Sequence, residues 1–197
     1  MNLVQMNTVQ NGGIPMTRII ENPKESILYH AKSIVVNEGY NNLTMRYVSE
    51  KSGISVGTIY NYFPTKKNLS IQLMEDYWNE YLIIVKEIDA NEADLFLKLH
   101  QIYDELVSFS ETFLQVWISN SNTKHDEDSR SRQNNFMKKI IQCLEDILMK
   151  AEAQGTINLS LNVHETSKFL LLNFIMMAQM KQFEYENFEN IIKKLFM

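Results

Sequence analysis

Apolar residues recur three and four positions apart along most of the chain, with polar residues between them, which is the pattern of amphipathic helices. The first run follows Asn22, Pro23 and Glu25, a helix-start signal with the arrangement of a capping box. Gly39 then ends this helix, as expected of a C-terminal cap residue. The later runs predict further helices, so the expected fold is all-α with about nine helices.

The later helices are expected at the following positions: Met45–Lys51, Val56–Phe63, a long helix after Thr65, Leu95–Leu106, Glu111–Ile118, Met137–Ala151, Val163–Gln182 and Tyr185–Phe196. Ser119–Gln133 is polar and charged, which predicts a surface loop or a frayed helix end. Thr156–Leu161 alternates polar and apolar residues. Because an isolated strand would have no pairing partner, we interpret it as an extended connection.

Two of these helices are short and lie close together. Thr44 can cap the first, and a tight turn at Ser52-Gly53-Ile54 follows it. Ser55 can cap the second, and Pro64 ends it. Two short helices joined by a turn of three or four residues that contains glycine form the helix-turn-helix pattern. In this pattern the apolar residues of the second helix, Ile59 and Phe63, should face inward, onto Val48 and Ile54.

Charge is distributed unevenly along the 197 residues, whose net charge is −5. Residues 16–70 carry seven lysines and arginines against four acidic residues, a net +3. The residues after them carry 12 basic against 20 acidic residues, a net −8. A basic N-terminal part on an acidic body is the polarity expected if only one end of the molecule meets phosphates.

The segment Thr44–Leu69 resembles the signature of the TetR/AcrR family of transcriptional regulators, and the resemblance extends upstream to about Pro23. The matching positions, all in one ungapped register, are Gly53, Ser55, Gly57, Thr58, Tyr60, Tyr62, Phe63 and Lys66. The resemblance implies an N-terminal three-helix helix-turn-helix headpiece and a C-terminal helical ligand-binding and dimerisation bundle. The domains expected are a flexible leader over 1–21, a DNA-binding domain over 22–69 and a ligand-binding and dimerisation domain over 70–197.

The second short helix has the residues needed to meet double-stranded DNA. Gly57 would let the backbone approach closely, Val56 can contact a thymine methyl, and Asn61 can pair with adenine. The hydroxyls of this helix can bond phosphates. The full expected DNA-binding set is Thr44, Arg46, Ser55, Val56, Gly57, Thr58, Tyr60, Asn61, Tyr62 and Lys66.

Several of these residues have a plainer reading. Thr44 is first a helix cap, Val56 can be an ordinary helix residue, Asn61 can be simply solvated, and Tyr60 or Tyr62 can be packing residues. The resemblance places Arg46 where some family members reach a base.

Lys66 and Lys67 lie at the N-terminus of the long helix that follows, where cations oppose the helix dipole. A bound phosphate would reverse this cost, so we interpret Lys66 as an anion contact rather than as a solvated lysine.

The helix Val163–Gln182 is apolar nearly all round and must be buried on all sides. A second protomer would do this, and the resemblance implies a homodimer formed by the last two helices. A monomer with an enclosed central helix is the alternative. The interface is expected to include Phe169, Leu172, Ile175, Met176, Phe188, Ile192 and Leu195.

The resemblance also implies a small-molecule effector bound within the body. An aromatic and methionine-rich lining would suit an apolar ligand, whereas ordinary core packing is the plainer interpretation of the same residues. The expected pocket residues are Trp78, Tyr81, Phe96, Tyr103, Phe113, Trp117, Met137 and Phe174.

Other classes of protein lack support in the sequence. Cys143 is the single cysteine, which excludes a disulfide framework and favours the cytoplasm; it is a redox-sensor candidate or a small core residue. The sequence has no membrane-spanning run and no secretory signal. It lacks enzyme motifs and clustered histidines and cysteines, so we expect no enzyme, no cofactor and no metal.

The sequence therefore predicts a dimeric repressor that binds a palindromic operator and is released by a small apolar effector. An activator would fit the same residues. A DNA-bound protein whose body recruits a protein partner is the second hypothesis, and a helical enzyme or carrier is the third.

Overall fold

The computed structural model describes residues 21–121, 127–180 and 183–196, and it leaves the side chains of residues 113–121 and 127–130 undescribed. This part of the chain forms eight α-helices and one short 3-10 helix, without strands. The elements are α1 (Pro23–Glu38), η1 (Tyr40–Asn42), α2 (Met45–Ser52), α3 (Val56–Tyr62), α4 (Lys66–Ala90), α5 (Leu95–Ser121), α6 (Glu127–Ala153), α7 (Val163–Gln179) and α8 (Tyr185–Phe196). The all-α prediction is confirmed. The expected leader lies almost entirely outside the described residues.

The predicted fifth and sixth helices are one continuous helix, α5, so the prediction of a break between them is wrong. Glu111, where the sixth helix was expected to begin, lies on the exposed side of α5, while Leu106 and Phe109 continue its buried side. Most of the predicted loop Ser119–Gln133 is also helical, because α5 runs to Ser121 and α6 begins at Glu127.

Side-chain caps fix where three helices of the N-terminal part begin. The hydroxyl oxygens of Thr44, Ser55 and Thr65 each accept a hydrogen bond from the backbone N–H three residues on, all at 3.1 Å. Each such cap contributes about 1 kcal/mol to helix stability. The capping box expected at Asn22 does not form. Asn22 has a left-handed backbone (φ 64°), and its side chain makes no cap hydrogen bond.

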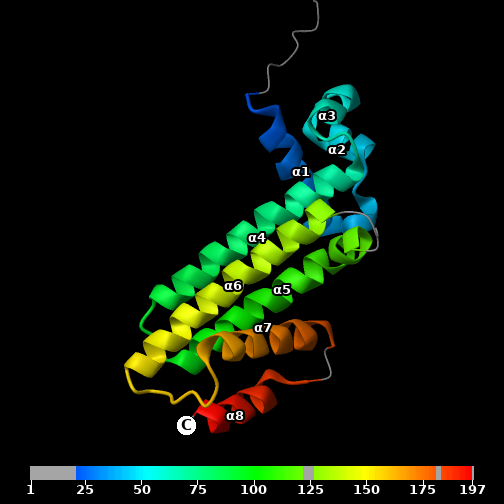
Figure 1. The fold of residues 1–197 in the computed structure, drawn as a ribbon. Coiled ribbons are helices and arrows are strands. Elements are labelled where there is room, and N and C mark those ends of the chain that lie inside the picture. Colours follow the sequence, from blue (N-terminus) through cyan, green and yellow to red (C-terminus); the bar gives the residue numbers. More distant parts are fainter. Residues whose placement is uncertain (1–20, 122–126, 181–182, 197) are drawn as a thin grey trace, which may run out of the picture.

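The long helices α4, α5 and α6 lie side by side, and the helices α1–α3 sit at one end of α4 (Figure 1). Helix α7 packs against α5 and α6, and α8 packs against α5 near the opposite end of the bundle. Helix α4 therefore runs from the headpiece into the body. Among the described residues, no helix is both long enough and apolar enough to span a membrane.

Candidate nucleic-acid interface and internal pocket

Helix α3 has a buried side and an outward side. Ile59 and Phe63 are buried on its inner side, and Val48 of α2 and Ile54 of the turn are buried with them, as the spacing predicted. On the outer side Tyr60 is 47% exposed and Tyr62 is 44% exposed. Keeping two large aromatic residues in solvent loses hydrophobic stabilisation, so this face has the composition of a binding surface rather than of a core.

The N-terminal turn of α3 is open to close approach by another molecule. A methyl group added at Gly57 would meet only the Ser55 hydroxyl, at 4.0 Å, so nothing in the protein itself requires glycine there. The Ser55 and Thr58 hydroxyl oxygens lie 2.8 Å apart, and the cap bond holds them at the helix start. Asn61 is exposed and Val56 is half-buried.

Helix α2 presents Arg46 to solvent beside the exposed cap residue Thr44. Farther along this helix, Lys51 lies 3.5 Å from a carboxylate oxygen of Glu38, and its ammonium sits over the Tyr47 ring. Contact with Tyr47, reinforced by Glu38, raises the pKa of Lys51. Lys51 is therefore tied to its own headpiece, whereas Arg46 faces outward.

Lys66 has a partner that the sequence argument did not consider. Its Nζ donates to the backbone carbonyl of Tyr40 at 3.3 Å and lies 4.2 Å from the centre of the Tyr40 ring. Burial lowers the pKa of Lys66. The Tyr40 carbonyl and ring stabilise the Lys66 ammonium at the start of α4 without a bound phosphate. The unfavourable helix dipole therefore no longer indicates that Lys66 binds an anion.

The exposed side of α7 carries a continuous apolar stripe. Phe169, Leu172 and Met176 of α7 are 39%, 58% and 51% exposed, and Met180, the residue that follows the helix, is 52% exposed, at spacings of three and four residues. On α8 the half-exposed apolar residues are Ile191 and Leu195.

The other predicted interface residues lie elsewhere. Phe188 and Ile192 are buried in the protomer's own core. Ile175 is half-buried and lines the internal pocket described next. Of the predicted set, the structure thus leaves Phe169, Leu172, Met176 and Leu195 exposed.

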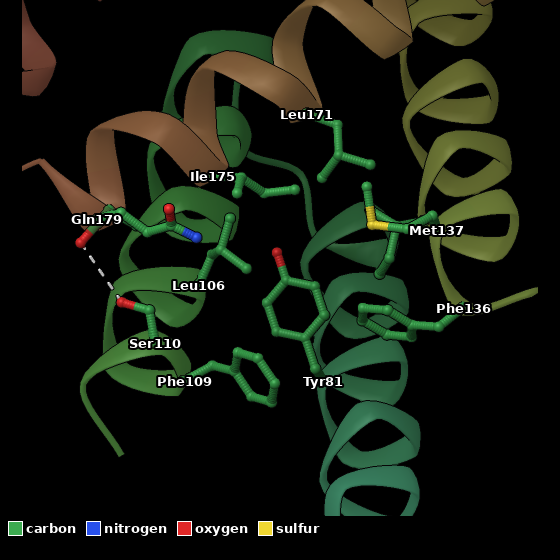
Figure 2. Close-up of a pocket in the computed structure, with 11 residues that line it drawn as sticks. Tyr81, Leu106, Phe109, Ser110, Phe136, Met137, Leu171, Ile175 and Gln179 are labelled. Atoms are coloured by element: carbon green, nitrogen blue, oxygen red, sulfur yellow. Dashed lines mark hydrogen bonds between the residues drawn. The ribbon is translucent and has the colours of Figure 1, made fainter. Parts of the chain in front are cut away.

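An internal pocket lies among α4, α5, α6 and α7, and its free volume is about 40 Å³. The Tyr81 ring lies between those of Phe109 and Phe136 (Figure 2). The hydroxyl of Tyr81 donates to the carbonyl of Ile102 at 3.0 Å. The remaining lining residues are mostly aliphatic, with Ser110 and Gln179 at one end: Leu106, Ser110, Met137, Ile140, Leu171, Ile175, Ala178 and Gln179. The pocket is therefore apolar and small.

The structure separates the residues that were predicted to line one pocket. Tyr81 and Met137 line the internal pocket, but Trp78 lines an outer cleft and Phe96 a groove at the far end of the bundle. Tyr103 and Phe174 pack with Tyr185 and Phe188 between α5, α7 and α8. The side chains of Phe113 and Trp117 lie outside the described residues. Phe109 and Phe136 were missed, because nothing in the sequence distinguishes them from core.

Cys143 is half-buried and packs against the core. Burial raises the pKa of its thiol. Since the thiolate is the reactive form, this environment favours the interpretation of Cys143 as a core residue over that of a redox sensor.

The short helices α2 and α3, joined by a turn at Gly53 with the outer side of α3 exposed, form a helix-turn-helix beside a helical body that holds an apolar pocket. Residues 27–73 match the family model "Bacterial regulatory proteins, tetR family". This match covers the helix-turn-helix and the start of α4, and it confirms the predicted resemblance to the TetR family over the headpiece.

Solved structures share the fold over nearly the whole chain. FadR from Bacillus subtilis, determined in complex with stearoyl-CoA, is 18% identical, with 87% of this chain and 96% of that one covered and a TM-score of 0.62. FadR from Bacillus halodurans, a fatty acid degradation regulator, is 16% identical, covering 89% and 95%, with a TM-score of 0.64. Reduced NemR from E. coli is 17% identical, covering 88% and 97%, with a TM-score of 0.68. No curated protein matches the chain significantly in sequence.

Proposed function

We propose that the protein is a dimeric repressor that binds a palindromic operator through α3 and releases it when an effector enters the body. The outer face of α3 carries this proposal, because it exposes Tyr60 and Tyr62 over a firmly buried inner face. In this proposal Gly57 admits the DNA backbone, and Thr44, Ser55, Thr58 and the two tyrosines bond phosphates. Arg46, Val56 and Asn61 are the candidates for base contacts.

Dimerisation is supported by the apolar stripe on α7. Four large apolar side chains in one row would be costly to leave in water, and a two-fold axis would pair the stripe with its copy. Such a dimer would also place two α3 helices about 34–36 Å apart, which is one turn of DNA. Leu195 and Ile191 of α8 extend the same interface.

An effector role is supported by the internal pocket, which is lined by α4, the helix that joins head and body. Bacillus subtilis FadR, which has the same fold, was determined with stearoyl-CoA bound. A ligand that fits one position of α4 better than another would shift the head and so the affinity for DNA. We assign the chain no enzymatic activity. A body that only recruits a protein partner would need no such pocket.

The proposal is tested by measuring operator binding with a fluorescent duplex from the chain's own upstream region, against a scrambled duplex of equal length. We expect specific binding that Tyr60→Ala weakens at least about tenfold. Leu97→Ala is the matched control, because Leu97 is also 47% exposed but lies on α5. Equal binding to both duplexes, or equal effects of the two substitutions, would refute the proposal. Lys66→Ala is less informative, since it also breaks the contact with Tyr40.

A further inference from the structure

A second cavity lies directly beside the internal pocket. It is an open cleft of about 250 Å³ between the outer sides of α4 and α6. Phe136 lines both cavities, so one aromatic side chain forms part of the wall between them. Its ring stacks on Trp78, with ring centres 4.6 Å apart and planes 10° apart. A movement of this stacked pair would join the cavities into one site.

The two cavities differ sharply in chemistry. The internal pocket is lined by aliphatic and aromatic side chains from four helices. The cleft is lined mainly by amides and charged groups, with the cations Arg132 and Lys139 against the single carboxylate of Glu75. Arg132 Nη1 lies 2.8 Å from a Glu75 oxygen, which holds the guanidinium at the cleft, and the lining stays net positive. An apolar pocket beside a cationic cleft suits a ligand with an apolar tail and an anionic head.

We propose that the effector is a long-chain amphiphile with an anionic head group. This inference rests on the proposed function, in which the body binds the effector, and it adds the chemical class of that effector. The tail occupies the pocket beneath Tyr81, and the head sits in the α4–α6 cleft on Arg132 and Lys139. A carboxylate and a phosphate-bearing acyl ester offer the same chemistry to these two cations.

Binding of this kind requires the protein to change shape. The pocket, at about 40 Å³, has space for about one water and not for a hydrocarbon chain. Entry of a tail therefore displaces Phe136 of α6 from Trp78 of α4. Because α4 carries the headpiece at its N-terminal end, separating these two helices is a direct route from ligand binding to the position of α3.

The head group is tested by titrating the full-length protein calorimetrically with dodecanoate, dodecanol and dodecyltrimethylammonium, each below its critical micelle concentration. We expect dodecanoate to bind at least about fivefold more tightly than dodecanol, and the cation to bind weakest. Dodecanoyl-CoA and free CoA distinguish the two sources of the anion. Tighter binding of the ester than of the acid assigns a phosphate, and the reverse assigns a carboxylate. Binding of dodecanol as tight as that of the tighter of the two anions would overturn the proposal, as would the absence of binding by both acid and ester.

Two substitutions locate the head and the tail. Lys139→Gln should weaken binding of the tighter anion about fivefold, whereas Lys138→Gln, which makes the same change one residue away and outside the cleft, should leave it unchanged. Ala178→Phe should fill the pocket and abolish binding of the tighter anion. If this variant has a much lower Tm than wild type, Ile175→Phe is used instead, because Ile175 lines the same pocket. Equal effects of the two lysine changes, or full binding by a folded pocket-filled variant, would overturn the proposal. Operator binding by the unliganded wild-type protein tests the DNA-binding proposal separately. If that binding is specific, the proposed DNA-binding function stands even where the effector proposal fails.

Discussion

Lys32 of α1 and Glu80 of α4 form an ion pair, with Nζ 2.6 Å from a carboxylate oxygen, that ties the headpiece to the body. The same ammonium lies 5.0 Å from the centre of the Tyr77 ring, and Tyr77 contacts Phe109 of the internal pocket at 5.4 Å between ring centres. The side chains of Lys32 and Glu80 are 36% and 50% exposed, so their ion pair contributes at most about 1 kcal/mol to the free energy of unfolding. Because this ion pair lies between the headpiece and the internal pocket, we expect it to couple ligand binding to DNA binding.

We predict that Glu80→Gln weakens the coupling between ligand and DNA. The operator Kd would be measured with and without saturating effector, and the ratio of the two should fall about twofold to fivefold, with little change in Tm. Glu87→Gln, the same change farther along α4, is the control and should keep the wild-type ratio. A large loss of Tm with an unchanged ratio would mean that the ion pair is only structural.

Gly57→Ala separates the demands of the fold from those of DNA. Because an added methyl group would meet nothing closer than 4.0 Å, the folded protein should keep or slightly raise its Tm. If the backbone of α3 approaches DNA at this point, the same methyl group should weaken operator binding about tenfold or more. Thermal unfolding and operator titration of one preparation measure both effects. An alanine variant that binds as tightly as wild type would place the DNA away from Gly57.

Gly53 is the contrasting case, because the requirement for glycine there is internal. Its φ of 69° is left-handed and ends α2 before the turn. Gly53→Ala should lower the free energy of unfolding by roughly 1–2 kcal/mol, although the added methyl group would contact no neighbour. Chemical denaturation checks the value. An unchanged midpoint would show that the turn readjusts without cost.

Leu172→Glu should dissociate the dimer. Leu172 lies in the middle of the α7 stripe and is 58% exposed in the protomer. Burying a carboxylate against its own copy should weaken dimerisation at least about 30-fold in Kd. Ile83→Glu is a close control, since Ile83 is 57% exposed but lies on α4. Sedimentation analysis should give a dimer for wild type and for the Ile83 variant, and a monomer for the Leu172 variant. A monomeric wild type would contradict the proposed interface.

The sequence was most informative where local chemistry decides the structure. Hydroxyl caps at Thr44, Ser55 and Thr65, and the spacing of Ile59 and Phe63, define the headpiece through neighbours in the chain. The pocket depends on which buried side of one helix meets which side of another, and periodicity cannot tell these apart. Phe174 and Phe136 are equally apolar in sequence, yet only Phe136 reaches both cavities.

Loss of the hydroxyl should change the free energy of unfolding differently at the two buried tyrosines, Tyr81 and Tyr185. The Tyr81 hydroxyl donates a hydrogen bond to the backbone carbonyl of Ile102, so Tyr81→Phe should lower the free energy of unfolding by about 1 kcal/mol. The Tyr185 hydroxyl is buried and finds no hydrogen-bond partner among the described residues, so Tyr185→Phe should be neutral or stabilising at pH 7.

Burial, reinforced by nearby carboxylates, raises the pKa of both tyrosines above 10. The folded state therefore holds these protons when the unfolded chain releases them, and wild-type stability should fall as pH rises above about 10. Both phenylalanine variants should show a shallower decline. Denaturation midpoints between pH 8 and pH 11, compared with the exposed control Tyr29→Phe, measure this slope. A decline equally steep in all four proteins would assign alkaline unfolding to other groups.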